Sequence, residues 1–388
     1  MLMDKDGQTD KTVEDAKDAE KPVENQTEKP TEQSVEKPAE TPVVAAPAEK
    51  PKHVVALLGV FIALEVAALV GIILWSNYNP KPKPVPVQTV TVTKPKVTSK
   101  LPGLQLDTKK NYGNKYASGV LPVGDGKYVT DKAKTGYIYA CGTYAQAVKA
   151  DTGGASTRGP WFTNNNTQYD STKKIHVLGS VTWKAQFTNA VSGATRTITT
   201  NDLPTHTTGV FPIATTDPAY AYDKNPNTIT GQSLTYALAN APTYSATPKC
   251  MGGQVGVMLT GIALFNAFDA GGRDAGAWEV QDSCGGHPEK EGEYHYHTLS
   301  SCITDVSVHT VLGYALDGFP ITGPKVGDNN MLTTSDLDEC HGITSQYFVD
   351  GKSVTGYHYV MTQDFPYSAS CFRSTAIQPP GLQTPPKS

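Results

Sequence analysis

The sequence predicts a mainly β domain, sandwich-like in build and stapled by disulfides, that follows a disordered tail and one transmembrane helix. The β domain is predicted because short runs of β-branched and aromatic residues recur from residue 104 onward, interrupted about every eight to twelve residues by Gly, Pro, Asn or Asp. The other two parts are predicted because residues 54–75 are almost entirely apolar, whereas residues 1–52 hold 13 Asp or Glu, 8 Lys and no aromatic residue.

Composition excludes two broad classes of protein. The chain of 388 residues has a formal net charge of −4 and no strongly basic patch, so we expect no nucleic-acid partner. The long apolar run excludes a fully soluble cytosolic enzyme.

Residues 1–52 are expected to form a disordered, low-complexity cytoplasmic tail. Glu-Lys-Pro recurs with a period of eight, ending at Pro22, Pro30 and Pro38, and it returns at Pro51. Proline at this spacing blocks helix propagation, and the segment cannot bury enough apolar surface to offset the entropy of ordering. The alternative is a ligand for a proline-reading partner, which the lack of an aromatic or Arg anchor disfavours.

Residues 53–76 are expected to be a transmembrane signal-anchor helix. The apolar run from Val54 to Trp75 has 22 residues, enough to cross about 30 Å of hydrocarbon. Trp75 and Tyr78 stand where aromatic residues anchor a span at the membrane interface. Glu65 in mid-span is either a tolerated defect or a contact between helices in the membrane.

Pro-rich segments follow the span and end the chain. Residues 77–103 alternate Pro with Lys, Val and Thr, which favours polyproline II and predicts a semi-rigid stalk. Residues 377–388 are expected to be a disordered C-terminal tail.

The cysteines predict the orientation, which the lysines flanking the span leave open. All six Cys follow residue 140, and an even number on one side of a span suits disulfides outside the cell. We therefore predict a single-pass protein of the cell membrane with an extracellular C-terminal domain. Sequence proximity favours the pairs Cys284–Cys302 and Cys340–Cys371, which leaves Cys141 for Cys250.

The outer part is predicted to comprise a β-rich extension, 104–160, and a main domain, 161–376. Short helices are expected at Ser233–Asn240 and at Thr334–Glu339, the second capped by Ser335. The clearest strand patterns are Lys127–Thr130, Gly136–Ala140, Ile175–Leu178, Thr195–Thr199 and Gly356–Met361.

Three histidines form the strongest candidate site. In Tyr294-His295-Tyr296-His297 the period of two places both His on one face of a strand and both Tyr on the other. A hairpin with its turn near 290–292 would return His287 beside them. Three His, or two His with Asp282 or Glu293, would suit a divalent metal ion, Zn or Cu.

A structural role is the alternative for these histidines, since a half-buried strand with Tyr inward and His outward has the same pattern. Three of the nine His lie within eleven residues, however, between Cys284 and Cys302. That concentration favours metal binding or catalysis.

Several motifs in the same stretch resemble the YHYH-domain family, which occurs in secreted and surface proteins of bacteria. The resemblance implies a domain identity and a candidate site over roughly residues 175–375, without implying a reaction. Thr322, where the family pattern has Tyr, and His341, where Asn is frequent, depart from it. The matching motifs are D-x-C-G-G-H (282–287), G-E-Y-H-Y-H (292–297), G-Y-A-L-D-G-F-P-I-T-G (313–323), L-D-E-C-H-G (337–342), Y-H-Y (357–359) and F-P-Y-S-A-S-C-F (365–372).

Asp317 and His358 complete the candidate site. Asp317 follows a strand-like run and precedes Gly318, so it is either a turn former or a carboxylate that orients a His or acts as a general base. His358 lies in a second Tyr-His-Tyr alternation and could join the metal ligands. His206 and His309 are further candidates for which a role other than ligand is favoured.

Two functions from different classes remain open on the sequence. One is a surface protein whose His site holds metal or uses a metal-bound water for hydrolysis. The other is an adhesion module that binds a surface glycan or protein, with structural His and with Trp161, Trp183 and Trp278 as aromatic platforms. The patterns G-x-S-x-G, H-E-x-x-H, C-x-x-C and the P-loop are absent from the sequence.

Overall fold

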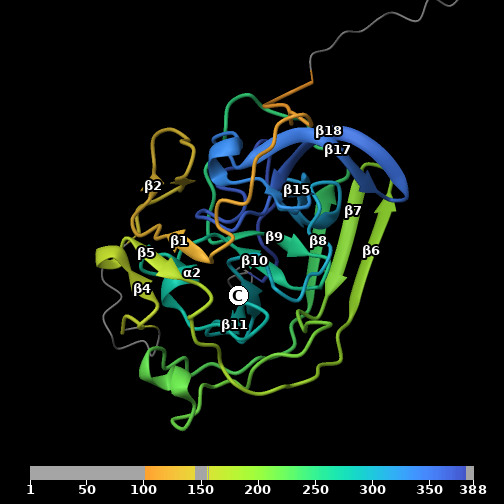
Figure 1. Cartoon of the computed structure of the whole chain (residues 1–388). Helices are drawn as coiled ribbons and strands as arrows, with labels where there is room; N and C mark the ends of the chain where they lie inside the picture. Colours follow the sequence, from red (N-terminus) through yellow and green to blue (C-terminus); the bar gives the residue numbers. More distant parts are fainter. Residues whose placement is uncertain (1–100, 145–154, 156, 382–388) are drawn as a thin grey trace, which may run out of the picture. The chain divides into compact units, whose positions relative to one another are not determined.

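The computed structural model describes residues 101–144, 155 and 157–381, all within one compact unit that spans Pro95–Ser388. This part is mainly β, with three disulfides and few, very short helices, as predicted (Figure 1). The predicted tail, span and most of the stalk lie outside the described residues. Within the described ranges, no helix has the length and apolar character needed to cross a membrane.

An eight-stranded mixed sheet forms the centre of the fold. Its neighbours pair antiparallel except for β10 with β12 and β14 with β18, which are parallel. Every residue of β9 and β13 is buried, as expected for strands covered on both faces. In spatial order the strands are β11 (Gly286–Pro288), β12 (Tyr294–Tyr296), β10 (Ala263–Phe265), β9 (Gln254–Met258), β13 (Val311–Ala315), β14 (Pro320–Thr322), β18 (Lys352–Val360) and β17 (Gly342–Val349).

Smaller elements surround this sheet. One three-stranded sheet has the order β1 (Val120–Pro122), β5 (Gln168–Asp170) and β4 (Phe162–Thr163). The other has the order β6 (Phe187–Ser192), β7 (Thr195–Thr200) and β8 (Leu234–Ala239). The two-stranded sheets are β2 (Tyr128–Val129) with β3 (Ile138–Tyr139) and β15 (Lys325–Gly327) with β16 (Asn330–Met331). The helices are α2 (Ala275–Trp278) and the 3₁₀ turns η2 (Asn164–Asn166), η3 (Pro218–Ala221) and η4 (Thr334–Asp336).

The β6–β8 sheet packs against the large sheet in one shared core. Ile198 of β7 and Tyr236 of β8 are fully buried in the same cluster as Val257 and Tyr314 of the large sheet. A second cluster around Trp161 and Trp278 joins the β1–β5–β4 sheet to α2.

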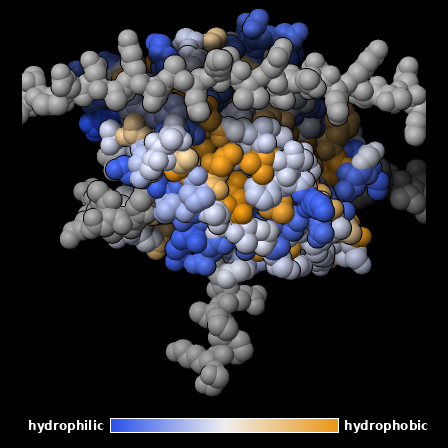
Figure 2. All heavy atoms as spheres, turned by 90° about the horizontal axis from the view of Figure 1, so that it is seen from below, coloured by the Kyte–Doolittle hydropathy of each residue, from blue (hydrophilic) through white to orange (hydrophobic). Residues whose placement is uncertain are grey.

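The surface is largely polar, as expected for a chain with this composition. Figure 2 shows one face on which polar side chains surround a central apolar patch. The large apolar side chains exposed in the described residues are Leu101, Leu104, Leu178, Val191, Val210, Leu259 and Phe348.

The helix predicted at Ser233–Asn240 was wrong, because this segment forms strand β8. Burial alternates strictly along it, with Leu234, Tyr236 and Leu238 inside and the residues between them exposed. Only a strand buries all three of these apolar residues on one face, since a helix would turn Tyr236 away from the other two.

Four of the five predicted strands are confirmed as β2, β3, β7 and β18. The fifth strand and the second predicted helix need correction. Ile175–Leu178 forms no strand, only an isolated bridge from Val177 to Asp282. The expected helix at Thr334–Glu339 is the single turn η4, and Thr333 rather than Ser335 stands at its start. The carboxylate of Asp336 accepts hydrogen bonds from the backbone N–H and the hydroxyl of Thr333.

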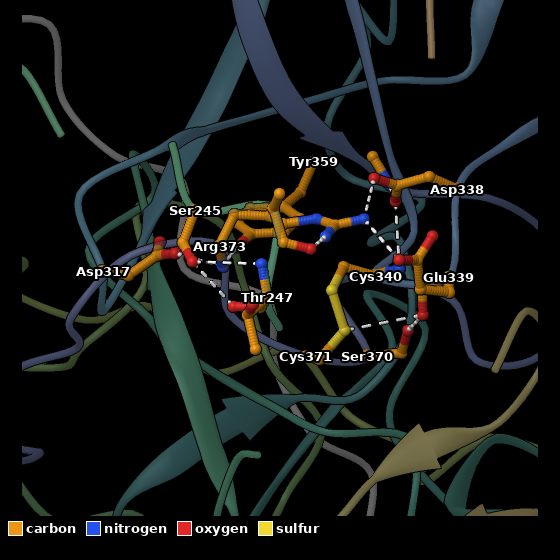
Figure 3. Close-up of a disulfide and its surroundings, with 12 residues drawn as sticks. Ser245, Thr247, Asp317, Asp338, Glu339, Cys340, Tyr359, Ser370, Cys371 and Arg373 are labelled. Carbon is orange, nitrogen blue, oxygen red and sulfur yellow. Dashed lines mark hydrogen bonds and ion pairs between the residues drawn. A yellow bond between two sulfur atoms is a disulfide. The ribbon is translucent and has the colours of Figure 1, made fainter. Parts of the chain in front are cut away.

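The three predicted disulfides are confirmed as Cys141–Cys250, Cys284–Cys302 and Cys340–Cys371. They close loops of very different length, with sequence separations of 109, 18 and 31. Figure 3 shows the third beside Arg373, whose guanidinium contacts Asp338 at 2.7 Å and Glu339 at 2.9 Å. The C-terminal segment is thus held by a disulfide and by the two ion pairs of the buried Arg373.

The alternation in β8 yields a stability prediction. Leu238→Ala should lower the free energy of unfolding by about 2–5 kcal/mol, because it leaves a cavity in the shared core. The matched control Thr235→Ala changes an exposed side chain of the same strand and should stay within about 0.5 kcal/mol. Urea unfolding followed by tryptophan fluorescence measures both, and equal effects would contradict the inward orientation of Leu238.

Candidate metal centre

The hairpin of β11 and β12 brings three histidines together. His287 pairs directly with His295 in the antiparallel register, as the predicted turn near 290–292 requires. Gly292 makes this turn with φ of +83°, a conformation that favours glycine. One ring nitrogen from each of His287, His295 and His297 lies within 4.8 Å of the others.

The tyrosines of β12 point to the opposite face, as the period of two predicts. The hydroxyl of Tyr294 donates to the carboxylate of Asp282 at 2.9 Å, and the hydroxyl of Tyr296 contacts Nε2 of His206. Asp282 also accepts backbone N–H bonds from Gly286 and Gly209, so its oxygens are used to hold the hairpin. Asp282 therefore anchors the site instead of supplying a ligand.

Backbone carbonyls determine which ring nitrogen carries the proton in two of the histidines. Nδ1 of His295 lies 3.1 Å from the carbonyl oxygen of Glu293, and Nδ1 of His297 lies 2.5 Å from that of Asn266. Carbonyl oxygens only accept hydrogen bonds, so Nδ1 is the donor in both rings and Nε2 carries a lone pair. Histidine ligands of metals commonly bind a carbonyl through their other nitrogen in this way.

These lone pairs face each other. Nε2 of His295 and Nε2 of His297 are 3.1 Å apart, and neither neutral ring has a proton to place between them. Both ring nitrogens of His287 are buried without a hydrogen-bond partner among the described residues. Phe265 stacks on His295 at 4.1 Å between ring centroids and holds that ring in place.

Glu279 adds a carboxylate that sequence reasoning missed. Its Oε2 lies 3.4 Å from Nε2 of His287 and 3.3 Å from Nε2 of His297, and it is buried without a hydrogen-bond partner in the described part of the chain. Glu279 follows α2, whose N-cap is Asp274. No motif in the sequence singles out Glu279. It reaches the hairpin only because the chain bends after α2, and a local sequence pattern does not show that bend. The sequence also offered Glu293 as a ligand, but among the described residues the carboxylate that contacts ring nitrogens of the triad is that of Glu279.

Burial sets the charges of the site. It lowers the pKa of His287 and His295 well below the usual value, and it lowers the pKa of His297 to about 4. Burial also raises the pKa of Glu279 well above its ordinary value. The facing lone pairs of His295 and His297 repel each other, and buried polar atoms without partners, such as those of His287 and Glu279, are rare in native proteins. A cation among these atoms would remove both penalties.

Three of the separations among the candidate ligand atoms match the edges of a tetrahedral site. Zn–N bonds of about 2.0–2.1 Å give a tetrahedron with edges of about 3.3–3.4 Å. The separations of 3.1, 3.3 and 3.4 Å between the ligand-type atoms lie close to this value.

His358 does not join this cluster. Its ring lies between β14 and β17, where Nδ1 contacts the hydroxyl of Thr322 at 2.9 Å and Nε2 contacts that of Ser345 at 2.8 Å. Burial lowers the pKa of His358 to about 3. With both nitrogens bonded to hydroxyls, His358 is a core histidine, and the structure corrects its assignment to the metal ligands.

Asp317 is also bound to other groups. Its carboxylate accepts hydrogen bonds from the hydroxyl of Tyr359 at 2.7 Å and from the backbone N–H groups of Arg373 and Ser374 at 3.0 and 2.9 Å (Figure 3). Burial raises its pKa. These contacts give Asp317 a structural use at a turn, in line with the alternative that the sequence left open, and supply no histidine for it to orient.

The two further candidate histidines, His206 and His309, lie outside the triad. His206 approaches Cys284 and Cys302, but both sulfurs are held in a disulfide. His309 contacts the backbone carbonyl of Gln346 through Nδ1.

Comparison with protein families bears out the resemblance. Residues 235–335 match the model of the family described as YHYH protein. This YHYH segment runs from β8 into η4 and contains Glu279 and all three histidines of the cluster. No curated protein and no solved structure matches the chain.

The structure shows the surroundings of both departures from the YHYH pattern. Thr322 uses its hydroxyl to contact His358. His341 has φ of +70°, a left-handed conformation that Asn adopts more readily than most residues, so the position suits the Asn that is frequent in the family.

Gly286 tests the hairpin geometry. A Cβ at this position would lie 2.2 Å from the ring of Tyr294, so Gly286→Ala must displace the tyrosine that anchors the hairpin. We expect a loss of about 1–3 kcal/mol in the free energy of unfolding. Gly252→Ala is the matched control, since its Cβ would meet nothing within 4 Å. Equal urea midpoints for both variants would contradict the close packing of Tyr294 on Gly286.

Proposed function

We propose that the protein is a membrane-anchored cell-surface protein whose YHYH segment holds one divalent metal ion. The ligands proposed are His287, His295 and His297, with Glu279 as the fourth group. The observation that carries the proposal is that the Nε2 lone pairs of His295 and His297 face each other at 3.1 Å, while both ring nitrogens of His287 and Oε2 of Glu279 are buried beside them without a hydrogen-bond partner among the described residues.

The donor set favours Zn, with Cu as the second choice. Three imidazole nitrogens and one carboxylate oxygen suit Zn, and imidazoles also bind Cu well. The chemistry that the ion supplies when bound is a concentrated positive charge, which offsets the repulsion among the acceptors.

A holding role is better supported than hydrolysis. The histidine side chains beside Glu279 are only 4–5% exposed, and about a fifth of the Glu279 side chain reaches the surface. A catalytic metal needs an open coordination position, whereas a structural site is closed by protein ligands. We therefore propose that the ion ties the β11–β12 hairpin, at the edge of the large sheet, to the segment that follows α2.

The cell-surface location rests on two features. Three disulfides suit an oxidising environment outside the cytoplasm. The 22-residue apolar run from Val54 to Trp75 is long enough for one membrane span.

Metal analysis of the purified full-length chain, made without a His tag, tests the centre. We expect about one Zn or Cu per chain by mass spectrometry. His295→Ala should lose it, and Glu279→Gln, which keeps the side-chain shape, should weaken metal binding about 10–100-fold. His309→Ala is the matched control and should retain the ion, because His309 lies outside the cluster.

Stability provides a second readout of the same site. Metal at about 100 times its dissociation constant should add about 2.7 kcal/mol to the free energy of unfolding of the wild type and nothing comparable to His295→Ala. Absence of bound metal after incubation with Zn, Cu and Mn would contradict the proposed function.

Cell fractionation tests the location. The full-length chain should remain with the membrane pellet after alkaline carbonate extraction, and deletion of residues 54–75 should release it. Protease added to intact cells should digest the disulfide-bonded domain and spare an epitope placed in residues 1–52. Recovery of the full-length chain in the soluble fraction would contradict the anchor.

A further inference from the structure

A cavity lies apart from the candidate metal centre. It has a volume of about 460 Å³ and is lined by Arg196 of β7, by the segment that follows β8, and by strands β13, β17 and β18 of the large sheet. In Figure 1 the labelled strands β6–β8, β17 and β18 lie toward the upper right, whereas β11 of the candidate metal centre lies below the centre. The volume falls within the range of small-molecule sites, about 300–1,000 Å³.

Five aromatic residues line the cavity. Tyr314, Phe319, Tyr347 and Tyr357 come from the large sheet and its turns, and Tyr244 comes from the segment between β8 and β9. Edge-to-face contacts hold the rings, with Tyr357 at 5.0 Å from Tyr244 and 5.2 Å from Phe319. The wall is therefore rigid before any ligand arrives.

An ion pair between the buried Arg196 and the half-exposed Asp350 forms the polar end of the cavity. Arg196 is 3% exposed, and it donates to Asp350 at 2.6 Å and to the amide oxygen of Asn240 at 3.1 Å. Its guanidinium also lies 4.3 Å from the ring centroid of Tyr314. Asp350 neutralises Arg196, so Lys352, at the exposed rim, is the remaining charge of the lining. This lining offers little to a multiply charged anion.

Several polar atoms at the cavity are free to bind a ligand. Among the described residues, the hydroxyls of Tyr244, Tyr314 and Tyr347 make no hydrogen bond. The same holds for the amide nitrogen of Asn240 and for Oδ1 of Asp350. The cavity thus combines apolar ring surfaces with neutral donors, neutral acceptors and one carboxylate oxygen.

We propose that this cavity binds a neutral saccharide. The C–H faces of a sugar ring pack on aromatic rings, and its hydroxyls both donate and accept hydrogen bonds, which matches the free atoms of the lining. A proline-rich peptide would also pack on the rings. Proline has no backbone N–H, however, so it could not donate hydrogen bonds to Asp350 or to the phenol oxygens. The tryptophans considered as platforms do not line the cavity, and Trp161 and Trp278 are buried in the second core cluster.

Calorimetric titration of the full-length chain tests this site. The probes are maltotetraose, cellotetraose, chitotetraose and laminaritetraose, each up to about 10 mM, a range that detects weak binding. We expect at least one to bind. Tyr347→Ala should weaken binding about tenfold or more, and Tyr347→Phe, which keeps the ring and the packing, about three- to tenfold. Tyr137→Ala is the matched control, because Tyr137 lies outside the cavity.

The outcomes separate this site from the metal centre. His295→Ala should leave saccharide binding unchanged, since none of the proposed metal ligands lines the cavity. Failure of all four saccharides to bind would overturn the proposal, as would equal affinity for wild type and both Tyr347 variants. Binding of a peptide with the sequence of residues 79–95, lost in Tyr347→Phe, would overturn it in favour of proline-rich recognition.

Discussion

The candidate metal centre depends on one electrostatic constraint: the buried Nε2 lone pairs of His295 and His297 are held face to face with no proton between them. Two carbonyl oxygens hold the Nδ1 protons of His295 and His297, which turns the Nε2 lone pairs toward each other at 3.1 Å. Glu279 brings a carboxylate oxygen to the same point. Such a cluster is costly in a low-dielectric interior unless a cation joins it, so the rest of the hairpin has to hold it together.

A buried Tyr–Asp pair fastens the hairpin, and the same kind of pair occurs at β18. Tyr294 binds Asp282 below the hairpin, and the same contact recurs between Tyr357 and Asp338 and between Tyr359 and Asp317. Each aspartate also accepts backbone N–H bonds, so each pair fastens one strand to a turn. The two Tyr-His-Tyr stretches therefore share their anchoring, while their histidines differ: His295 meets other imidazoles and His358 meets hydroxyls.

The sequence predicted those elements whose geometry depends on residues close together in the chain. The period of two in 294–297, the turn that returns His287 and the sequence proximity of the cysteines were sufficient for the histidine triad and the three disulfides. Glu279 could not be found in this way, because its place depends on the path of the chain after α2. Strand β8 was mistaken for a helix because Ala and Leu favour helices in isolation, and packing on the large sheet overrides that preference.

Anomalous diffraction from crystals of the chain grown with zinc tests the metal centre most directly. The account predicts one strong peak at the zinc absorption edge, about 2.0–2.1 Å from Nε2 of His295 and Nε2 of His297, with His287 and Glu279 completing the shell. A map without a peak at this position, and with the three rings bridged only by water or turned to other partners, would contradict the account.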